Sequence, residues 1–100
     1  MTYTFIYSSK AEKEFIEAFN FYEEQLLGLD ERFESCIDRK LKEIIRSPYL
    51  YPSKRTGLQE CWVKEFPFLI VYNVSDQREL VIVTSIFHTS RNPRKKYPRQ

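Results

Sequence analysis

The sequence has few of the residues that build metal sites and disulfide frameworks. Histidine occurs once, as His88, and the two cysteines, Cys36 and Cys61, are far apart and belong to no Cys-x-x-Cys motif. A zinc site needs several such ligands in close spacing, so neither a metal nor another cofactor is expected. We expect both cysteines to be small buried apolar residues in a reducing compartment.

Long apolar runs are also absent. No stretch reaches the length of a membrane span, and the first residues, MTYTFIYSS, lack a basic segment followed by a long apolar one. This pattern predicts a cytoplasmic protein with no membrane contact.

Glycine is scarce, with two residues in 100, so few backbone positions can need a positive φ. Hydrophobic residues make up 42% and aromatic residues 16% of the chain, which is typical of a packed domain. We expect one domain over residues 1–91. A basic tail over residues 92–100 is expected to fray, or to fold only with a partner.

Positive charge is concentrated at the end of the chain. Residues 91–100 contain five basic residues and no acid, whereas residues 1–90 contain 11 basic and 14 acidic residues. This asymmetry suggests contact with something anionic, nucleic acid being the usual partner. A solvated tail without a partner is the alternative, and charge alone favours that alternative.

The first half of the chain predicts one strand and one helix before its first glycine. The aromatic run at 3–7 predicts a strand, and apolar residues at three- and four-residue steps predict a helix over about 10–26. Ser9 and Glu12 have the spacing of a capping box at the start of this helix.

A second helix is predicted to follow at once. Gly28 suits a C-cap or a tight turn, and Asp30 suits the N-cap of a helix that ends near Arg46. So short a connection predicts an antiparallel helical hairpin.

The second half predicts a loop over 49–57 and then three strands, LQECWVKEF, FLIVYNV and ELVIVTSIFH. Strict alternation in the last strand would place Ile86 and His88 on one face with Leu80, Ile82 and Thr84, and Val81, Val83, Ser85 and Phe87 on the other. Both faces are mostly apolar, so this strand is expected to be central. The fold class is therefore α+β, in the order β-α-α-β-β-β, with the hairpin packed on one face of a small, mostly antiparallel sheet.

Nearly the whole chain carries a family resemblance, in four segments: YEEQLLGLDERF (22–33), residues 48–52, KEFPFLIVYNV (64–74) and VTSIFHTSRNPRKK (83–96). In this order and spacing they resemble the RelE/ParE toxins of type II toxin–antitoxin systems, which include plasmid stabilisation proteins. The most specific part is FPFLIVY followed by IFHTSRNP.

The resemblance implies a RelE-like fold and growth inhibition by the toxin half of a bacterial operon, neutralised by a small cognate antitoxin. Some members of the family cut mRNA in the ribosomal A site, and others inhibit DNA gyrase without nuclease chemistry. The antitoxin is expected to use a groove over the helices or the exposed sheet face.

Metal-independent RNA cleavage would need an acid, a base and cations around the phosphate. His88 is the natural acid or base, Arg91 could hold the phosphate, Lys64 could add charge from an earlier strand, and Tyr97 could stack on a base. Equally, His88 could cap the core, Arg91 could pair with an acid of the first helix, and Lys64 could be solvated. Tyr97 lies in the predicted tail, where an ordered role is less expected.

Further basic residues are candidates for binding the target or a nucleic acid. They lie in the loop before the three strands and in the tail: Lys54, Arg55, Arg94, Lys95 and Lys96, together with Lys64. The alternative for the loop pair is plain surface charge. Trp62 is expected in the core or against the antitoxin.

The comparison with RNA-cutting relatives points to the ParE branch. Those related to RelE carry an arginine where this chain has Leu69, and a second strand lysine where it has Trp62. Other RNA-cutting branches place a histidine and a tyrosine near the C-terminus, as His88 and Tyr97 do. Three hypotheses remain: a ParE-like toxin acting on gyrase or translation, a ribosome-dependent endoribonuclease using His88 and Arg91, and a non-toxic antitoxin-binding remnant.

Overall fold

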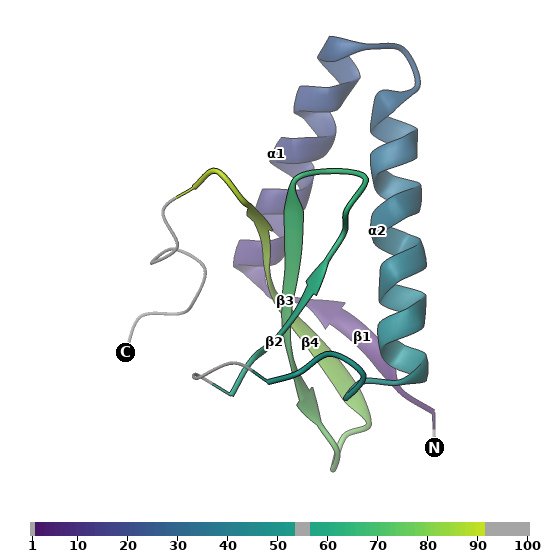
Figure 1. The fold of residues 1–100 in the computed structure, drawn as a ribbon, viewed down its shortest axis with the longest axis vertical. Coiled ribbons are helices and arrows are strands. Elements are labelled where there is room, and N and C mark those ends of the chain that lie inside the picture. The colour runs from purple at the N-terminus through teal and green to yellow at the C-terminus, as the bar shows by residue number, and fades with distance from the viewer. Residues whose placement is uncertain (1, 54–56, 92–100) are drawn as a thin grey trace.

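A computed structural model describes residues 2–53 and 57–91 of the chain. Figure 1 shows a helical hairpin standing beside a twisted sheet, with the elements in the predicted β-α-α-β-β-β order. Their bounds are β1 Thr4–Tyr7, α1 Ser9–Gln25, α2 Leu29–Arg46, β2 Gln59–Trp62, β3 Phe68–Ser75 and β4 Leu80–His88. The predictions for Lys54, Arg55 and the tail over 92–100 lie outside the described residues.

Helix α1 begins one residue earlier than the capping pattern suggested. The cap is Ser8, in extended conformation, and its hydroxyl accepts from the backbone N–H of Ala11 at 3.1 Å. The backbone N–H of Ser8 also donates to the carbonyl of Val83 at 2.8 Å, so the last sheet contact and the helix cap fall on the same residue. The prediction of a capping box at Ser9 and Glu12 was therefore wrong.

The connection between the helices turns on Gly28, which has a φ of 85° and directly precedes α2. A residue with a Cβ is strained in this left-handed region, which explains a glycine in so glycine-poor a chain. Asp30 does not cap α2 as predicted. It lies in the first turn, where its carboxylate accepts from the N–H of Glu31 at 2.9 Å and complements the helix dipole.

The sheet has the strand order β1-β4-β3-β2. As predicted, β4 is a central strand and the sheet is mostly antiparallel: β4 pairs with β3 and β3 with β2 in antiparallel fashion, and only β1 is parallel to β4. Phe68 lies opposite His88 at one end of the β3–β4 pair, and Ser75 lies opposite Leu80 at the other.

A β-bulge in β4 overturns the predicted strict alternation. Tyr72 pairs with Val83 and Val71 pairs with Ser85, so Thr84 is an additional residue in β4. Val81 and Val83 belong to the core under the helices; beyond the bulge Ile86 does so, while Phe87 packs with Leu58 and Val71 in a separate cluster. Ile86 and Phe87 have thus exchanged faces relative to strict alternation.

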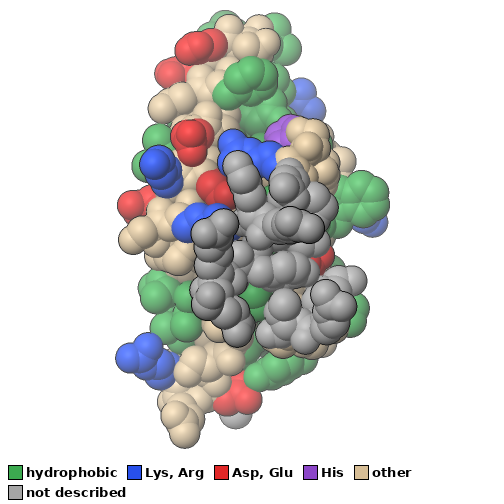
Figure 2. Space-filling model, turned by 90° about the vertical axis from the view of Figure 1, so that its left-hand side faces the viewer, with side chains coloured by type: hydrophobic (Ala, Val, Ile, Leu, Met, Phe, Trp, Pro, Cys, Tyr) green, Lys and Arg blue, Asp and Glu red, His purple; other side chains and the backbone are tan. Residues whose placement is uncertain are grey.

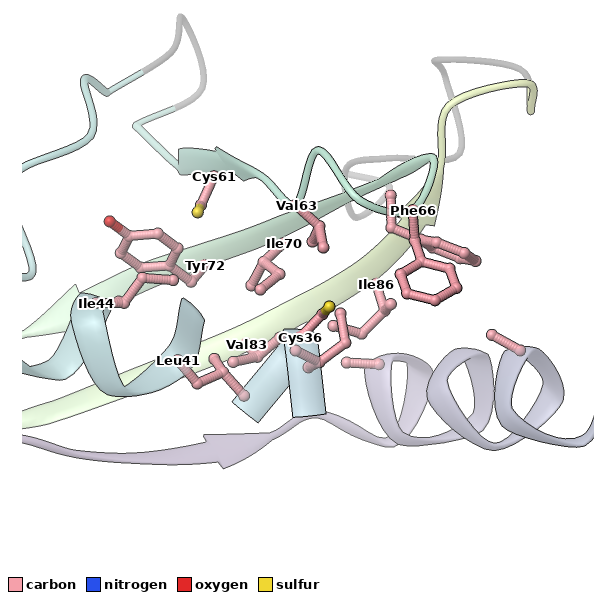
Figure 3. Packing of buried hydrophobic residues seen from close by; sticks show 14 of the residues in the cluster. Cys36, Leu41, Ile44, Cys61, Val63, Phe66, Ile70, Tyr72, Val83 and Ile86 are labelled. Carbon is pink, nitrogen blue, oxygen red and sulfur yellow. The ribbon is translucent and has the colours of Figure 1, made fainter. Parts of the chain in front are cut away.

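The core lies between the helices and the sheet (Figure 3). Leu41 and Ile44 of α2 belong to the same core as Ile70 and Tyr72 of β3. The Tyr72 hydroxyl donates to the carbonyl of Pro48 at 2.8 Å. Both cysteines are free and buried here, as predicted, and burial raises the pKa of the Cys61 thiol. This keeps the thiol protonated and chemically inert.

Candidate target-binding site

The motif His88-x-x-Arg91 forms a tight turn at the end of β4. The backbone N–H of Arg91 donates to the carbonyl of His88 at 3.0 Å, and the N–H of Thr89 donates to the carbonyl of Pro67 at 2.9 Å. The turn is therefore fixed both to itself and to the β2–β3 connection. We call this end of the sheet, with Glu14 of α1, the pocket end.

A pocket of about 390 Å³ opens between α1 and the end of β4. Its apolar wall is formed by Ala18, Phe21, Tyr22, Phe68 and Ile86. Its polar edge is formed by Glu14, Glu17, His88, Ser90 and Arg91. Figure 2 shows the single histidine at the surface, with basic and acidic side chains close by. The pocket thus has an aromatic wall and a mixed-charge rim.

The His88 ring is held from two sides. It packs edge-on against Phe68, with the ring centroids 5.0 Å apart and the planes at 84°. Its Nδ1 accepts from the backbone N–H of Ser90 at 3.1 Å and lies 2.7 Å from the Ser90 hydroxyl. Because a backbone N–H can only donate, the neutral ring carries its proton on Nε2. His88 therefore offers the pocket a hydrogen-bond donor.

Glu14 was not among the residues identified from the sequence. One of its carboxylate oxygens accepts from the Ser85 hydroxyl at 2.8 Å and from the N–H of Ile86 at 3.0 Å. Its side chain is 10% exposed. The available signal was its position, since it lies between the buried alanines Ala11 and Ala18 on the inward face of α1.

Arg91 faces the same acid. One of its terminal nitrogens lies 4.0 Å from the other carboxylate oxygen of Glu14, and the arginine side chain is 49% exposed. This is the pairing with an acid of the first helix that the sequence left open. Arg91 therefore combines a loose ion pair with an open face toward solvent.

Some of the remaining candidates from the sequence lie within the described residues and others lie outside them. Lys64 is exposed but does not lie on a strand as predicted: β2 ends at Trp62, and Lys64 has a φ of 74° in the connection to β3. Trp62 is 58% exposed, so it is not a core residue. Lys54, Arg55, Arg94, Lys95, Lys96 and Tyr97 lie outside the described residues.

A second polar cluster lies at the opposite end of the sheet, which we call the turn end. The hydroxyls of Tyr3 and Tyr49 both donate to the same carboxylate oxygen of Asp76, each at 2.8 Å. These hydrogen bonds lower the pKa of Asp76, and the bond to Asp76 raises the pKa of Tyr3 to about 12. The cluster joins the residue before β1, the loop after α2 and the β3–β4 turn.

A membrane-spanning helix and a metal site each have requirements that can be compared with residues 2–53 and 57–91. Neither helix there is long and apolar enough to cross a membrane. Nor do these ranges bring together three histidine, cysteine, aspartate or glutamate side chains that could hold a metal ion.

Comparison with known proteins identifies the fold and the family. A solved structure described as the chromosomal ParDE TA system from P. aeruginosa matches with a TM-score of 0.68 at 15% sequence identity, covering 87% of this chain and 96% of the other. No curated protein sequence matches significantly. The family described as the ParE toxin of the type II toxin–antitoxin system parDE matches residues 5–93, a range that contains β1 to β4 and the turn from His88 to Arg91. The chain therefore belongs to the ParE toxin family of type II toxin–antitoxin systems, and this membership implies a ParD antitoxin as its partner.

Proposed function

We propose that this toxin arrests growth in the cytoplasm by binding DNA gyrase through its pocket end, without cutting RNA. The observation that carries the proposal is the state of the polar groups there. The Nδ1 atom of His88, the carboxylate of Glu14 and the guanidinium of Arg91 already interact with neighbouring groups of the chain. They form a fixed surface for recognition.

RNA cleavage would require a different arrangement. A general base must have a free acceptor near the 2′-hydroxyl. The Nδ1 of His88 accepts from Ser90, while Glu14 accepts two hydrogen bonds with one oxygen and faces Arg91 with the other. In this arrangement the two groups best suited to remove a proton are engaged elsewhere.

The surface suits binding to a protein. Arg91 is half exposed beside the aromatic wall, and arginine and aromatic side chains are enriched at the centres of interfaces. Lys64 lies at the same end of the sheet, since its connection is joined to the β4 turn through Pro67 and Thr89. We propose that Lys54, Arg55, Lys64, Arg94, Lys95 and Lys96 contribute attraction to an anionic target.

Residues 1–91 are proposed to form the folded toxin domain and residues 92–100 a basic extension of its target surface. A chain that ends at Arg91 should then fold with an unchanged circular dichroism spectrum and bind its target more weakly. A shortened chain that fails to fold would contradict this division.

An endoribonuclease is the second candidate. It is favoured by the position of His88 and Arg91, because the Nε2–H donor of His88 and the exposed face of Arg91 border an open pocket. In that case His88 would have to take up a second proton to act as the acid, Arg91 would hold the phosphate, and Tyr97 would assist. Translation in place of gyrase would then be the process that the toxin blocks.

The two candidates are separated by two assays on the same protein. Purified toxin should inhibit DNA supercoiling by purified gyrase, and primer extension after brief induction should find mRNAs intact. Cuts in codon register that disappear with His88→Ala would overturn the proposal and establish the nuclease. Normal growth despite a folded, abundant product would instead indicate the non-toxic antitoxin-binding remnant.

A further inference from the structure

We propose that Glu14 is the positioning residue of the pocket end: from α1 it holds the bulge of β4 and so turns His88 and Arg91 toward the pocket. In naming this end the target surface, the inference rests on the proposed function. The positioning itself rests on contacts within the chain.

The bulge decides which face His88 occupies. If Thr84 were a regularly paired residue and not a bulge, alternation from Val81 and Val83 would place Phe87 under the helices and His88 on the opposite face. With the bulge, Ile86 lies in the core and His88 lines the pocket against α1. A one-residue change of register would thus remove the histidine from the site.

A bulge interrupts the ladder, and its polar groups need partners elsewhere. Directly after the bulge, Glu14 supplies one oxygen to two groups, the fully buried Ser85 hydroxyl and the N–H of Ile86. The Thr84 hydroxyl donates to the carbonyl of Val71 at 3.2 Å, and the Ser8 hydroxyl donates to the carbonyl of Thr84 at 3.2 Å. Of these partners, only Glu14 brings a charge.

The second oxygen of Glu14 extends the same control to Arg91. It lies 4.0 Å from the guanidinium, which places the arginine over the pocket. The hydrogen bonds from Ser85 and Ile86 fix this carboxylate, because hydrogen bonds to a carboxylate are among the stronger ones in proteins. The carboxylate is also mostly shielded from water. One side chain of α1 therefore sets the bulge, the histidine and the arginine together.

Two substitutions separate these effects. Glu14→Gln keeps an acceptor oxygen for Ser85 and Ile86 but presents an uncharged group to Arg91. Glu14→Ala removes both. Glu23→Ala is the matched control, because Glu23 is an exposed acid of the same helix that does not line the pocket.

The test is nuclear magnetic resonance of the purified protein. In Glu14→Ala the Ile86 amide should exchange with solvent at least roughly tenfold faster, and the ring contact between His88 and Phe68 should be lost. Glu14→Gln and Glu23→Ala should keep both signals. An alanine variant that keeps both signals would overturn the proposal.

A further variant keeps the test decisive when the alanine variant fails to fold. If Glu14→Ala does not fold, Glu14→Asp decides the matter, because its carboxylate is one methylene short of Ile86. The same losses are then expected, and retention of both signals overturns the proposal.

Growth arrest separates this inference from the proposed function. We expect arrest to be lost in Glu14→Ala and rescued, at least in part, in Glu14→Gln. Loss of the ring contact with arrest intact would support the positioning by Glu14 and contradict the pocket end as the target surface.

Discussion

At the turn end of the sheet, Asp76 takes the hydroxyls of Tyr3 and Tyr49 on one oxygen, and the three side chains tie together segments far apart in the sequence. At the pocket end, Glu14 also takes two donors on one oxygen, yet its other oxygen faces a half-exposed arginine beside an open pocket. A carboxylate oxygen that accepts two hydrogen bonds thus occurs at both ends of the sheet, but only Glu14 also borders the pocket. A shared carboxylate alone is therefore no sign of function. Our proposal assigns function to the pocket end because a pocket and an exposed cation adjoin the carboxylate there.

The largest effect on stability is expected from removing Phe68, the buried aromatic residue that packs against His88 at the pocket end. Phe68 is 5% exposed and packs against Phe33, with centroids 5.2 Å apart, and against His88. Phe68→Ala should lower the free energy of unfolding by about 3–5 kcal/mol, measured by urea denaturation. A loss below about 1 kcal/mol would mean that this end does not depend on its aromatic cluster.

A smaller loss in the free energy of unfolding is expected from a substitution at the centre of the sheet, between its two ends. Tyr72→Phe removes the buried hydroxyl that donates to Pro48 and leaves that carbonyl without this donor. We expect a loss of about 1–3 kcal/mol in the same denaturation assay, with growth arrest unchanged. Unchanged stability would show that water replaces the hydroxyl.

The contribution of the turn end to stability is expected to depend mainly on pH. The pKa of Tyr3 is raised from 10.0 to about 12, so its contribution to stability is complete below pH 10 and is lost as pH rises toward 12. The pKa of Asp76 is lowered from 3.8, so its contribution is complete above that value and is lost as pH falls below it. Thermal unfolding of Tyr3→Phe across the alkaline range and of Asp76→Asn across the acid range should each show a weaker dependence than the unaltered protein. A dependence as steep as that of the unaltered protein would contradict the shared-carboxylate account.

The smallest effect is expected away from both clusters. Trp62 is 58% exposed on the outermost strand β2, so Trp62→Ala should change the free energy of unfolding by about 0.5 kcal/mol or less. Circular dichroism during heating measures it. A larger loss would mean that the Trp62 side chain contributes to the stability of the fold.

The sequence predicted the element order, the central β4 and the buried cysteines, because these follow from apolar periodicity and composition. It missed the bulge at Thr84, because an additional residue in a strand leaves no mark in a run that is apolar on both faces. That omission misplaced His88 relative to Val81 and Val83 and hid Glu14, whose partners depend on the bulge. The cap at Ser8 was missed because two adjacent serines offer the same chemistry, and a sheet hydrogen bond to Val83 selects between them.

From the sequence, His88 and Arg91 could be named as residues of the candidate site, but Glu14 and the arrangement of the three could not. The spacing of His88 and Arg91 indicated a pair at the strand end, and the turn does join them through the backbone. The Ser90 contact with His88 is local to the turn, but the pairing of Glu14 with Arg91 depends on how a helix from the other end of the chain packs against β4. Such contacts are set by tertiary packing and leave no local pattern.

The most direct test of the account compares one variant from each end in a gyrase supercoiling assay with equal amounts of folded protein. Arg91→Ala should lose inhibition of supercoiling while its melting temperature stays near that of the unaltered toxin. Asp76→Ala should keep full inhibition with a lower melting temperature. Inhibition that survives Arg91→Ala, or that disappears with Asp76→Ala, would contradict the pocket end as the surface through which this toxin acts.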